Sequence, residues 1–85
     1  MIWQIHWSMR GIRDLKKLDE PIKKKILDSL DNLVQQPKSA DIKKLEVKPD
    51  EYRLRIGDWR VRFRVDFTNK TYLITHVKHR KNVYK

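Results

Sequence analysis

Two stretches of alternating polar and apolar residues, separated by a Gly-Asp pair, constrain the fold of this chain more than any other feature. Residues 52–56 and 59–67 change from one class to the other at every position, which is typical of β-strands with one buried face. The pair between them, Gly57 and Asp58, fits a two-residue hairpin loop, and glycine in its first position favours a type II′ turn. The sequence therefore predicts an antiparallel hairpin whose register is set by this loop.

The predicted register sorts the hairpin side chains onto two faces. The apolar face is expected to hold Tyr52, Leu54, Ile56, Trp59, Val61, Phe63, Val65 and Phe67. The opposite face is expected to hold Arg53, Arg55, Arg60, Arg62 and Arg64. Like charges that face each other across a sheet destabilise it by roughly 0.2–1 kcal/mol per pair, and only Asp66 is expected to relieve this row. A row of arginines that costs stability indicates a surface for phosphate groups, which guanidinium groups bind with several donors.

The arginine face belongs to a wider excess of positive charge. The 85 residues carry a formal net charge of +10, and the isoelectric point is about 10.1. Only Arg10 and Arg13 precede the hairpin, whereas all other arginines lie within residues 53–80. A basic excess that is clustered in this way indicates a polyanionic partner, which could be RNA, DNA, an anionic membrane surface or an acidic protein.

The N-terminal part of the chain predicts one strand and two helices. Residues 2–7 alternate and are rich in aromatic and β-branched side chains, as in a strand. Ser8 is a suitable N-cap for a first helix over about 9–18, whose apolar face would consist of Met9, Ile12, Leu15 and Leu18. Residues 19–36 open with Asp-Glu-Pro and predict a second helix, which ends before a proline.

The remaining segments complete an α+β domain. Residues 37–50 contain two prolines and mixed charges and are expected to form an irregular connection. Residues 71–79, after a turn at 68–70, predict a third strand beside the hairpin. The predicted order is β-α-α-β-β-β over a single domain, residues 1–85, with an N-terminal αα-hairpin packed on a small, mainly antiparallel twisted sheet.

Composition excludes several classes of protein. The absence of cysteine removes disulfides, zinc–thiolate sites and thiol nucleophiles, and is typical of a cytoplasmic protein. No apolar run approaches the roughly 20 residues that a membrane-spanning helix needs, and the first residues lack a signal-peptide pattern. His76 and His79 are interpreted as neighbours on one face of the last strand, without the carboxylates that would complete a metal site. We therefore expect no metal and no other cofactor.

Three segments carry a resemblance to a known family: Leu15-Lys-Lys-Leu-Asp19, Tyr52-Arg-Leu-Arg-Ile-Gly-Asp-Trp-Arg-Val61 and His79-Arg-Lys-Asn-Val-Tyr84. Together they make the chain similar, from end to end, to the RelE/ParE toxin superfamily. The strand–Gly-Asp–aromatic–Arg hairpin is common to that superfamily. The last segment resembles the RelE branch, whose members are ribosome-dependent mRNA endonucleases, whereas the ParE branch poisons gyrase and generally lacks it.

The resemblance implies a catalytic site. It places Arg53 and Arg55 at the two catalytic basic positions of the family, Arg60 at the phosphate-binding arginine after the turn, and Arg80 and Tyr84 at the tail positions. The implied reaction is attack of a ribose 2′-OH on the adjacent phosphate, which leaves a 2′,3′-cyclic phosphate and needs no metal. Because arginine keeps its proton, the three hairpin arginines are expected to act electrostatically, while Arg80 or Tyr84 serves the leaving group.

The proton acceptor of that reaction stays open at this point. Candidates are His76, His79, a ribosomal group and water. Basic side chains around the implied site are expected to hold the RNA, namely Arg62, Arg64, Lys78, His79 and Lys81.

The resemblance also implies partners: an acidic RelB-like antitoxin, joined in a toxin–antitoxin heterotetramer, and the ribosome with its mRNA. Two alternatives remain open, a ParE-like inhibitor of gyrase and a basic RNA-binding module without catalysis. The segment that holds Arg80 and Tyr84 favours the mRNA endonuclease over the gyrase inhibitor. The arginine strands lack spaced surface aromatics, which proteins that bind single-stranded nucleic acid usually combine with cations. This disfavours the RNA-binding module without catalysis.

Overall fold

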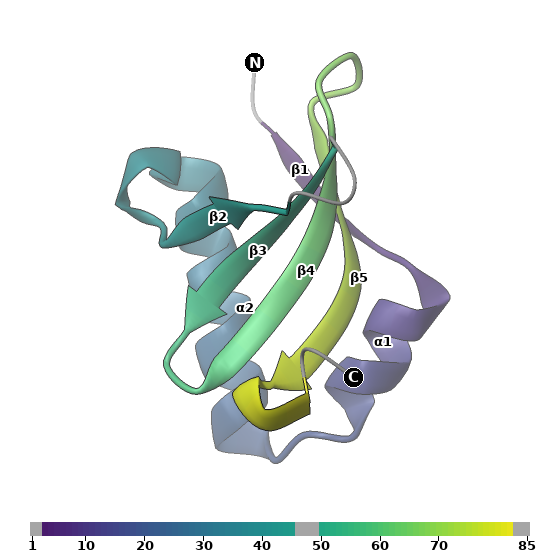
Figure 1. The fold of residues 1–85 in the computed structure, drawn as a ribbon, viewed down its shortest axis with the longest axis vertical. Coiled ribbons are helices and arrows are strands. Elements are labelled where there is room, and N and C mark those ends of the chain that lie inside the picture. Colours follow the sequence, from purple (N-terminus) through teal and green to yellow (C-terminus); the bar gives the residue numbers. More distant parts are fainter. Residues whose placement is uncertain (1–2, 46–49, 83–85) are drawn as a thin grey trace.

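The computed structural model describes residues 3–45 and 50–82. Its elements, in chain order, are β1 (Gln4–Trp7), α1 (Met9–Lys16), α2 (Glu20–Gln35), the 3-10 turn η1 (Pro37–Ser39), β2 (Ile42–Lys44), β3 (Glu51–Ile56), β4 (Trp59–Asp66), β5 (Thr71–His79) and the 3-10 turn η2 (Arg80–Asn82) (Figure 1). The five strands form one sheet in the order β1-β5-β4-β3-β2. β1 runs parallel to β5 and all other neighbours are antiparallel, so the predicted α+β class with a mainly antiparallel sheet is confirmed.

The hairpin between β3 and β4 has the predicted register. Ile56 pairs with Trp59 and Arg55 with Arg60, and the pairing continues to the start of β3. Gly57 has a φ of 58°, whereas Asp58 keeps a negative φ, which is the pattern of a type II′ turn. The loop therefore fixes which side chains face the core and which face outward.

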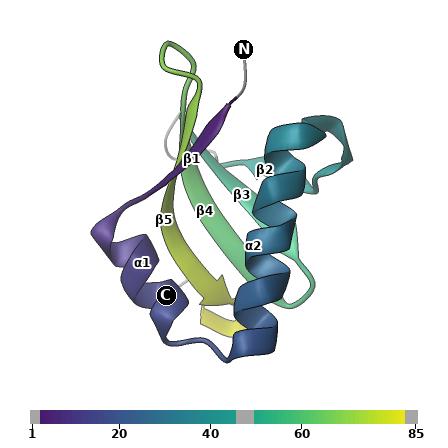
Figure 2. The same ribbon diagram turned by 180° about the vertical axis from the view of Figure 1, so that it is seen from behind.

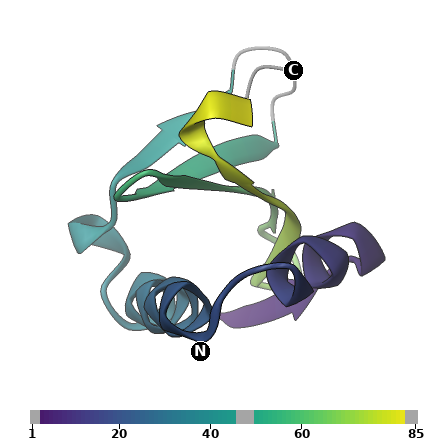
Figure 3. The same cartoon turned by 90° about the horizontal axis from the view of Figure 1, so that it is seen from below.

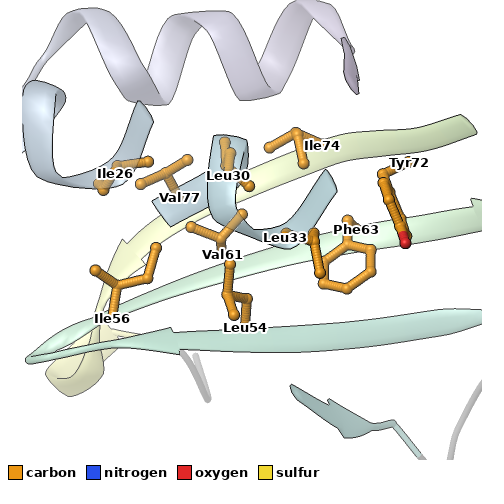
Figure 4. Packing of buried hydrophobic residues seen from close by; sticks show 10 residues of the cluster. All are labelled: Ile26, Leu30, Leu33, Leu54, Ile56, Val61, Phe63, Tyr72, Ile74 and Val77. Atoms are coloured by element: carbon orange, nitrogen blue, oxygen red, sulfur yellow. The ribbon is translucent and has the colours of Figure 1, made fainter. Parts of the chain in front are cut away.

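The core lies between α2 and the sheet. Figure 2 shows α2 crossing the sheet, and Figure 3, seen from below, shows η2 on the opposite side from α2. Figure 4 shows the buried cluster, made of Ile26, Leu30, Leu33, Leu54, Ile56, Val61, Phe63, Tyr72, Ile74 and Val77. Burying one such aliphatic or aromatic side chain contributes about 1.5–3 kcal/mol, so this layer stabilises the packing of α2 on the sheet.

One residue of the predicted apolar face lies outside the core. Phe67 is 66% exposed, because β4 ends at Asp66 and the chain turns away before Phe67 can face α2. Its ring instead meets the edge of Trp3, with centroids 5.8 Å apart. The prediction that Phe67 belongs to the core is therefore wrong.

The segment predicted to be irregular contains a short strand. Ile42 pairs with Leu54, and Lys43 pairs with Arg53, so β2 is the outer neighbour of β3. The strand has only three residues, and its two lysines are exposed, so no alternation is visible in the sequence. Short, lysine-rich edge strands are a common protection against pairing with other chains.

Helix α1 buries a different face from the one predicted. Met9 is 81% exposed and Ile12 is 40% exposed, whereas Gly11 and Asp14 are buried. Leu15 and Leu18, the other half of the predicted apolar face, do pack against the core. The reason for the difference is that α1 begins at the Ser8 N-cap, as predicted, but then runs along the edge of β5.

Three contacts attach α1 to β5. The Ser8 N–H donates to the carbonyl of Ile74 at 2.9 Å, and the Asp14 carboxylate accepts from the N–H of Val77 at 3.0 Å. A Cβ on Gly11 would collide with the Ile74 carbonyl oxygen, so only glycine permits this approach. β1 pairs with β5 only as far as Ile74. Beyond that residue, the Asp14 side chain of α1 provides the hydrogen-bond acceptor for the edge of β5. Across both described ranges, no helix is long and apolar enough to cross a membrane.

Candidate nucleic-acid interface

The sheet face that points away from α2 carries two rows of basic residues that cross three strands. In the first row, Arg62 of β4 pairs with Arg53 on one side and His76 on the other. In the second row, Arg60 pairs with Arg55 and Lys78. Neighbouring strands lie about 4.8 Å apart and the two rows about 7 Å apart. We call these six residues the basic grid: Arg53, Arg62, His76, Arg55, Arg60 and Lys78.

A β-bulge in β5 brings His76 into the basic grid. Phe63 pairs with Ile74, whereas the preceding residue, Arg62, pairs with His76, so Thr75 is the extra residue. Regular alternation from the buried Ile74 would have turned His76 toward α2. The bulge shifts the alternation by one position, and His76 shares the outer face with the arginines.

The two histidines of β5 lie on opposite faces of the sheet. His79 pairs with Trp59, and their rings meet edge to face with centroids 5.3 Å apart. Its Nδ1 accepts the N–H of Lys81 at 3.3 Å. The prediction that His76 and His79 share one face is therefore wrong, because the two residues lie three positions apart, and an odd spacing in an unbroken stretch of strand puts side chains on opposite faces. In the part of the chain that the structure describes, no group of three or more His, Cys, Asp or Glu side chains could hold a metal ion.

Two carboxylates neutralise one end of the arginine face. Asp50 accepts from Arg64 Nη2 at 2.7 Å and from Arg64 Nε at 3.1 Å, and this hydrogen bonding raises the pKa of Arg64. Glu51, which is buried, lies 3.4 Å from Arg62 Nη2. Arg62 Nε is buried without a hydrogen-bond partner among the described residues, an arrangement that costs stability. Arg62 and Arg64 are thus largely compensated within the protein.

Asp66 does not relieve the arginine row, contrary to the prediction. Its carboxylate accepts from the backbone N–H of Asn69 at 3.0 Å and from the Asn69 side-chain amide at 2.8 Å. These hydrogen bonds, the backbone one first, lower the pKa of Asp66. Asp66 therefore stabilises the β4–β5 turn, and the arginines are balanced by carboxylates that the prediction did not include.

The opposite end of the face, near the Gly57–Asp58 turn, is less compensated. Arg55 Nε lies 3.9 Å from Asp41, and both side chains are largely exposed, so the ion pair contributes little. Arg60 donates to the backbone carbonyls of Gly57 at 2.8 Å and Trp59 at 2.9 Å. No carboxylate of the described ranges lies within ion-pair distance of Arg60. Positive charge is therefore most available at the turn.

The turn η2 adds Arg80 to this end. The N–H of Arg80 donates to the Asp58 carbonyl at 2.8 Å, and its Nε lies 3.6 Å from the Asp58 carboxylate. The side chains of Arg80 and Lys81 are exposed. Arg60 and Arg80, which lie 20 positions apart in the chain, are thus both attached to the Gly57–Asp58 turn.

Lys78 belongs to the basic grid, but its charge is committed elsewhere. Its Nζ lies 3.3 Å from Asp14, whose carboxylate is buried at the junction of α1 and β5. The same carboxylate accepts the N–H of Val77. Lys78 is therefore held against α1. Because its charge is paired with Asp14, Lys78 is less available to bind RNA than Arg55 or Arg60.

His76 lies in a cationic environment. Burial lowers the pKa of its imidazole first, and the positive charges of Arg10, Arg62 and Lys78 lower it further, against a smaller opposite effect of Asp14. These effects favour the neutral form of the ring at pH 7. Arg10 lies in α1 and belongs to no recognisable motif, so its position near His76 was not predicted from the sequence.

The predicted site residues thus divide into groups. The grid brings together Arg53, Arg55, Arg60, Arg62 and Lys78, and η2 adds Arg80 and Lys81 beside the turn. Arg64 lies outside the grid, beyond the row that holds Arg62, and forms an ion pair with Asp50. His79 packs against the ring of Trp59. Tyr84 lies outside the described residues.

Comparison with known proteins is consistent with this geometry. The family model described as the ParE toxin of the type II toxin–antitoxin system parDE matches residues 5–84. A curated relative, putative toxin RelE1 of Methanocaldococcus jannaschii, is 30% identical over 88 residues, which cover 100% of this chain and 98% of the relative. The chain belongs to the RelE/ParE toxin superfamily. It is a toxin of the type II toxin–antitoxin class.

Solved structures of this superfamily share the fold. The archaeal RelE–RelB complex from Pyrococcus horikoshii OT3 contains a chain with a TM-score of 0.78 and 27% identity, with 98% of this chain and 100% of that chain covered. The RelB–RelE antitoxin–toxin complex from Methanococcus jannaschii gives a TM-score of 0.78 and 25% identity, with 94% and 95% covered. The isolated RelE toxin of E. coli, at 18% identity, shares the fold alone, with a TM-score of 0.76 and 96% and 90% covered.

Proposed function

We propose that this toxin is an endoribonuclease that cleaves mRNA on the ribosome and so inhibits translation. The observation that supports the proposal best is the cluster of Arg55, Arg60 and Arg80 around the Gly57–Asp58 turn, where few carboxylates compete for their charge. Several fixed guanidinium groups on one face suit a phosphodiester backbone, since each offers paired donors to phosphate oxygens. The arginines oppose one another across the hairpin, so a selection for stability alone does not account for them.

The proposed reaction uses the ribose next to the cleaved bond. The 2′-oxygen attacks the adjacent phosphorus, the bond to the 5′-oxygen breaks, and a 2′,3′-cyclic phosphate and a 5′-hydroxyl remain. Arg53, Arg55 and Arg60 stabilise the extra negative charge of the pentacoordinate phosphorane. Arg80 binds the same phosphate, and Tyr84 protonates or stacks beside the leaving group. Orientation of the mRNA by the ribosome supplies a further part of the rate, and an enzyme that depends on ribosomes works in the cytoplasm.

The cognate partner of the toxin is proposed to be an acidic RelB-like antitoxin. The relatives from P. horikoshii and M. jannaschii were solved in complex with RelB. A net charge of +10 on this chain favours a partner with Asp and Glu over the basic grid, and two copies of each chain would form a heterotetramer. Affinity for such a partner falls as salt rises where the charge pairs are exposed.

One experiment tests the endonuclease directly. The purified chain is added to an in vitro translation reaction, and the mRNA is examined by primer extension. Cuts at positions set by the codon in the ribosome support the proposal, and Arg55→Glu should lose them while Lys24→Glu, an equal charge change on α2, should keep them. Intact mRNA in the presence of active toxin would contradict it.

A second candidate function is inhibition of gyrase, because the matching family model is that of ParE. Gyrase–DNA complexes that accumulate while the mRNA stays intact would support this candidate. The same purified protein can be tested in both reactions. The two outcomes therefore separate the two branches of the superfamily.

A further inference from the structure

The proposed reaction needs a proton acceptor, and the arginines of the basic grid cannot supply one. Arginine keeps its proton at any pH at which a ribosome works. The acceptor must lie close to the arginines that hold the phosphate, because the attacking 2′-hydroxyl is on the ribose that carries that phosphate. β5 carries two histidines, His76 within the grid and His79 near its edge, whose imidazole rings are candidate acceptors.

The two histidines differ in position. His79 pairs with Trp59, contacts its ring, and uses its Nδ1 to accept the N–H of Lys81. It therefore has a structural role at the start of η2. His76 pairs with Arg62 on the outer face, and it lies diagonal to Arg60. Of the two histidines, only His76 lies directly opposite an arginine of the first row, Arg62, and diagonally opposite an arginine of the second row, Arg60.

A hydroxyl group fixes the tautomer of His76. The Thr75 Oγ1 donates its single proton to the carbonyl of Arg62 at 3.2 Å. The same Oγ1 lies 2.9 Å from His76 Nδ1, and with its proton already used it can only accept there. Nδ1 therefore carries the imidazole proton, and Nε2 carries the free lone pair of the neutral ring. Within the described chain, Nε2 has no hydrogen-bond partner.

The bulge that places His76 also supplies the hydroxyl that orients it. Thr75 is the extra residue of β5, and its side chain bonds back across the strand pair to Arg62. β-bulges are frequent beside active sites, where they turn a side chain onto a new face. One irregularity in β5 thus gives both the position and the tautomer of His76.

We infer that His76 is the general base of this enzyme, with Nε2 taking the proton of the attacking 2′-hydroxyl. The inference rests on the proposed function and adds a catalytic residue to it. The proton passes from the 2′-oxygen to Nε2 as that oxygen bonds to phosphorus. The bond between phosphorus and the 5′-oxygen breaks, and the 5′-oxygen takes a proton from water. The imidazolium then returns its proton to the donor, so the protons balance.

The charges around His76 suit this role. Arg10 of α1, Arg62 of β4 and Lys78 of β5 each keep the imidazole neutral, and Asp14 of α1 opposes them only in part. Burial, the largest cause, acts in the same direction, so the pKa of His76 lies below its ordinary value of 6.5. A base must be unprotonated before it can accept a proton, and the lowered pKa of His76 favours the unprotonated ring at neutral pH.

The test is single-turnover cleavage of mRNA on programmed ribosomes from pH 5.5 to 8.5. For the wild type, the rate should rise with pH through the pKa of His76 and then level off. His76→Gln should lower the plateau rate by about 10²–10⁴-fold and remove the acid limb, while ribosome binding stays unchanged. His6→Gln is the matched control, because His6 is an exposed histidine on the same face at the edge strand β1 and outside the grid.

The possible outcomes separate the inference from the proposed function. A His76→Gln variant as active as the wild type, with the same pH profile, would overturn the inference and leave the endonuclease standing. A wild type that leaves the mRNA intact would overturn the proposed function and the inference together. Circular dichroism shows whether each variant is folded.

A second measurement does not depend on cleavage or on a folded His76 variant. Nitrogen-15 NMR of the imidazole in the wild-type protein should find the proton on Nδ1 and a pKa below 6.5. Arg10→Gln should raise that pKa, because it removes a positive charge that faces the ring. A proton on Nε2 in the neutral ring would overturn the inference, since no lone pair would then be free to act.

Discussion

The backbone N–H of Arg80 donates a 2.8 Å hydrogen bond to the backbone carbonyl of Asp58. This bond attaches the start of η2 to the hairpin turn, where Arg60 is also anchored through the Gly57 carbonyl. Because the bond is made by the main chain, the position of Arg80 does not depend on its side chain. Arginines from the hairpin and from the end of β5 are therefore held together by one tight turn. The first residue of this turn, Gly57, has a positive φ, which glycine adopts at little cost.

Charge reversal at Arg55 should abolish activity without unfolding the protein. Arg55 faces Arg60 across the hairpin, and its ion pair with Asp41 is 3.9 Å long and exposed. Arg55→Glu replaces a repulsion with an attraction, so the free energy of unfolding should stay within about 1 kcal/mol or rise. Thermal melting and mRNA cleavage measure the two effects. A cooperative loss of the folded signal would mean that the arginine is structural.

The hairpin shows how far sequence reasoning reached. The loop Gly57–Asp58 fixed the register, and the alternation on both sides of it then gave the two faces correctly. Extending that alternation back by one residue would also have put Glu51 on the arginine face, where it lies opposite Arg64 and forms an ion pair with Arg62. The missed carboxylate was thus visible in the pattern.

The outward position of His76 and the packing of α1 could not be predicted in this way. Neither a single extra residue at Thr75 nor the approach of α1 to a strand edge leaves a periodic signal in the sequence. Regular alternation and helical spacing both assume an unbroken element packed by its apolar side chains. Gly11, which lowers helix propensity, was in fact the sign of a close backbone contact.

Gly11→Ala should destabilise the protein, although the same change in an ordinary exposed helix stabilises it. The usual gain is about 0.5–1 kcal/mol, because alanine is the better helix former. Here the added Cβ would collide with the Ile74 carbonyl oxygen, so α1 must move off β5, at a cost of about 1–3 kcal/mol. Urea unfolding measures the sign. Met9→Ala, at an exposed position of the same helix, should change stability by no more than about 0.5 kcal/mol.

Asp14→Ala should cost more than Asp14→Asn. The Asp14 carboxylate accepts the N–H of Val77 and lies 3.3 Å from the ammonium of Lys78. Asparagine keeps one acceptor for Val77, whereas alanine leaves a buried N–H unpaired, which costs about 1–3 kcal/mol. Hydrogen exchange of the Val77 amide should accelerate in the alanine variant and much less in the asparagine variant. Equal stability of the two variants would show that the hydrogen bond to Val77 contributes nothing.

Stability should fall as the pH drops below 6.5, and His76 should account for part of the fall. Burial and nearby cations lower the pKa of His76 in the folded state, so between that pKa and 6.5 the unfolded chain binds a proton that the folded protein does not. Stability therefore rises with pH across this window and levels above it. Asp66 titrates in a separate window below 3.8, because its pKa is also lowered. Melting temperatures from pH 5 to 8 should depend less on pH in His76→Gln, and an unchanged slope would contradict the assignment.

Removing the Arg80 guanidinium should lower cleavage while stability is unaffected. The Asp58 carboxylate lies 3.6 Å from Arg80 Nε, and both side chains are exposed, so the ion pair contributes less than about 1 kcal/mol. The backbone bond to Asp58 persists in Arg80→Gln and keeps η2 on the turn.

Loss of one charged phosphate contact in Arg80→Gln should reduce the cleavage rate by about 10²–10³-fold, as the loss of a transition-state donor does. Arg80→Lys should recover part of the rate, because lysine keeps the charge but not the paired donors. Single-turnover cleavage compares the two variants with Arg13→Gln, an equal change on α1. Full activity of Arg80→Gln would remove Arg80 from the site.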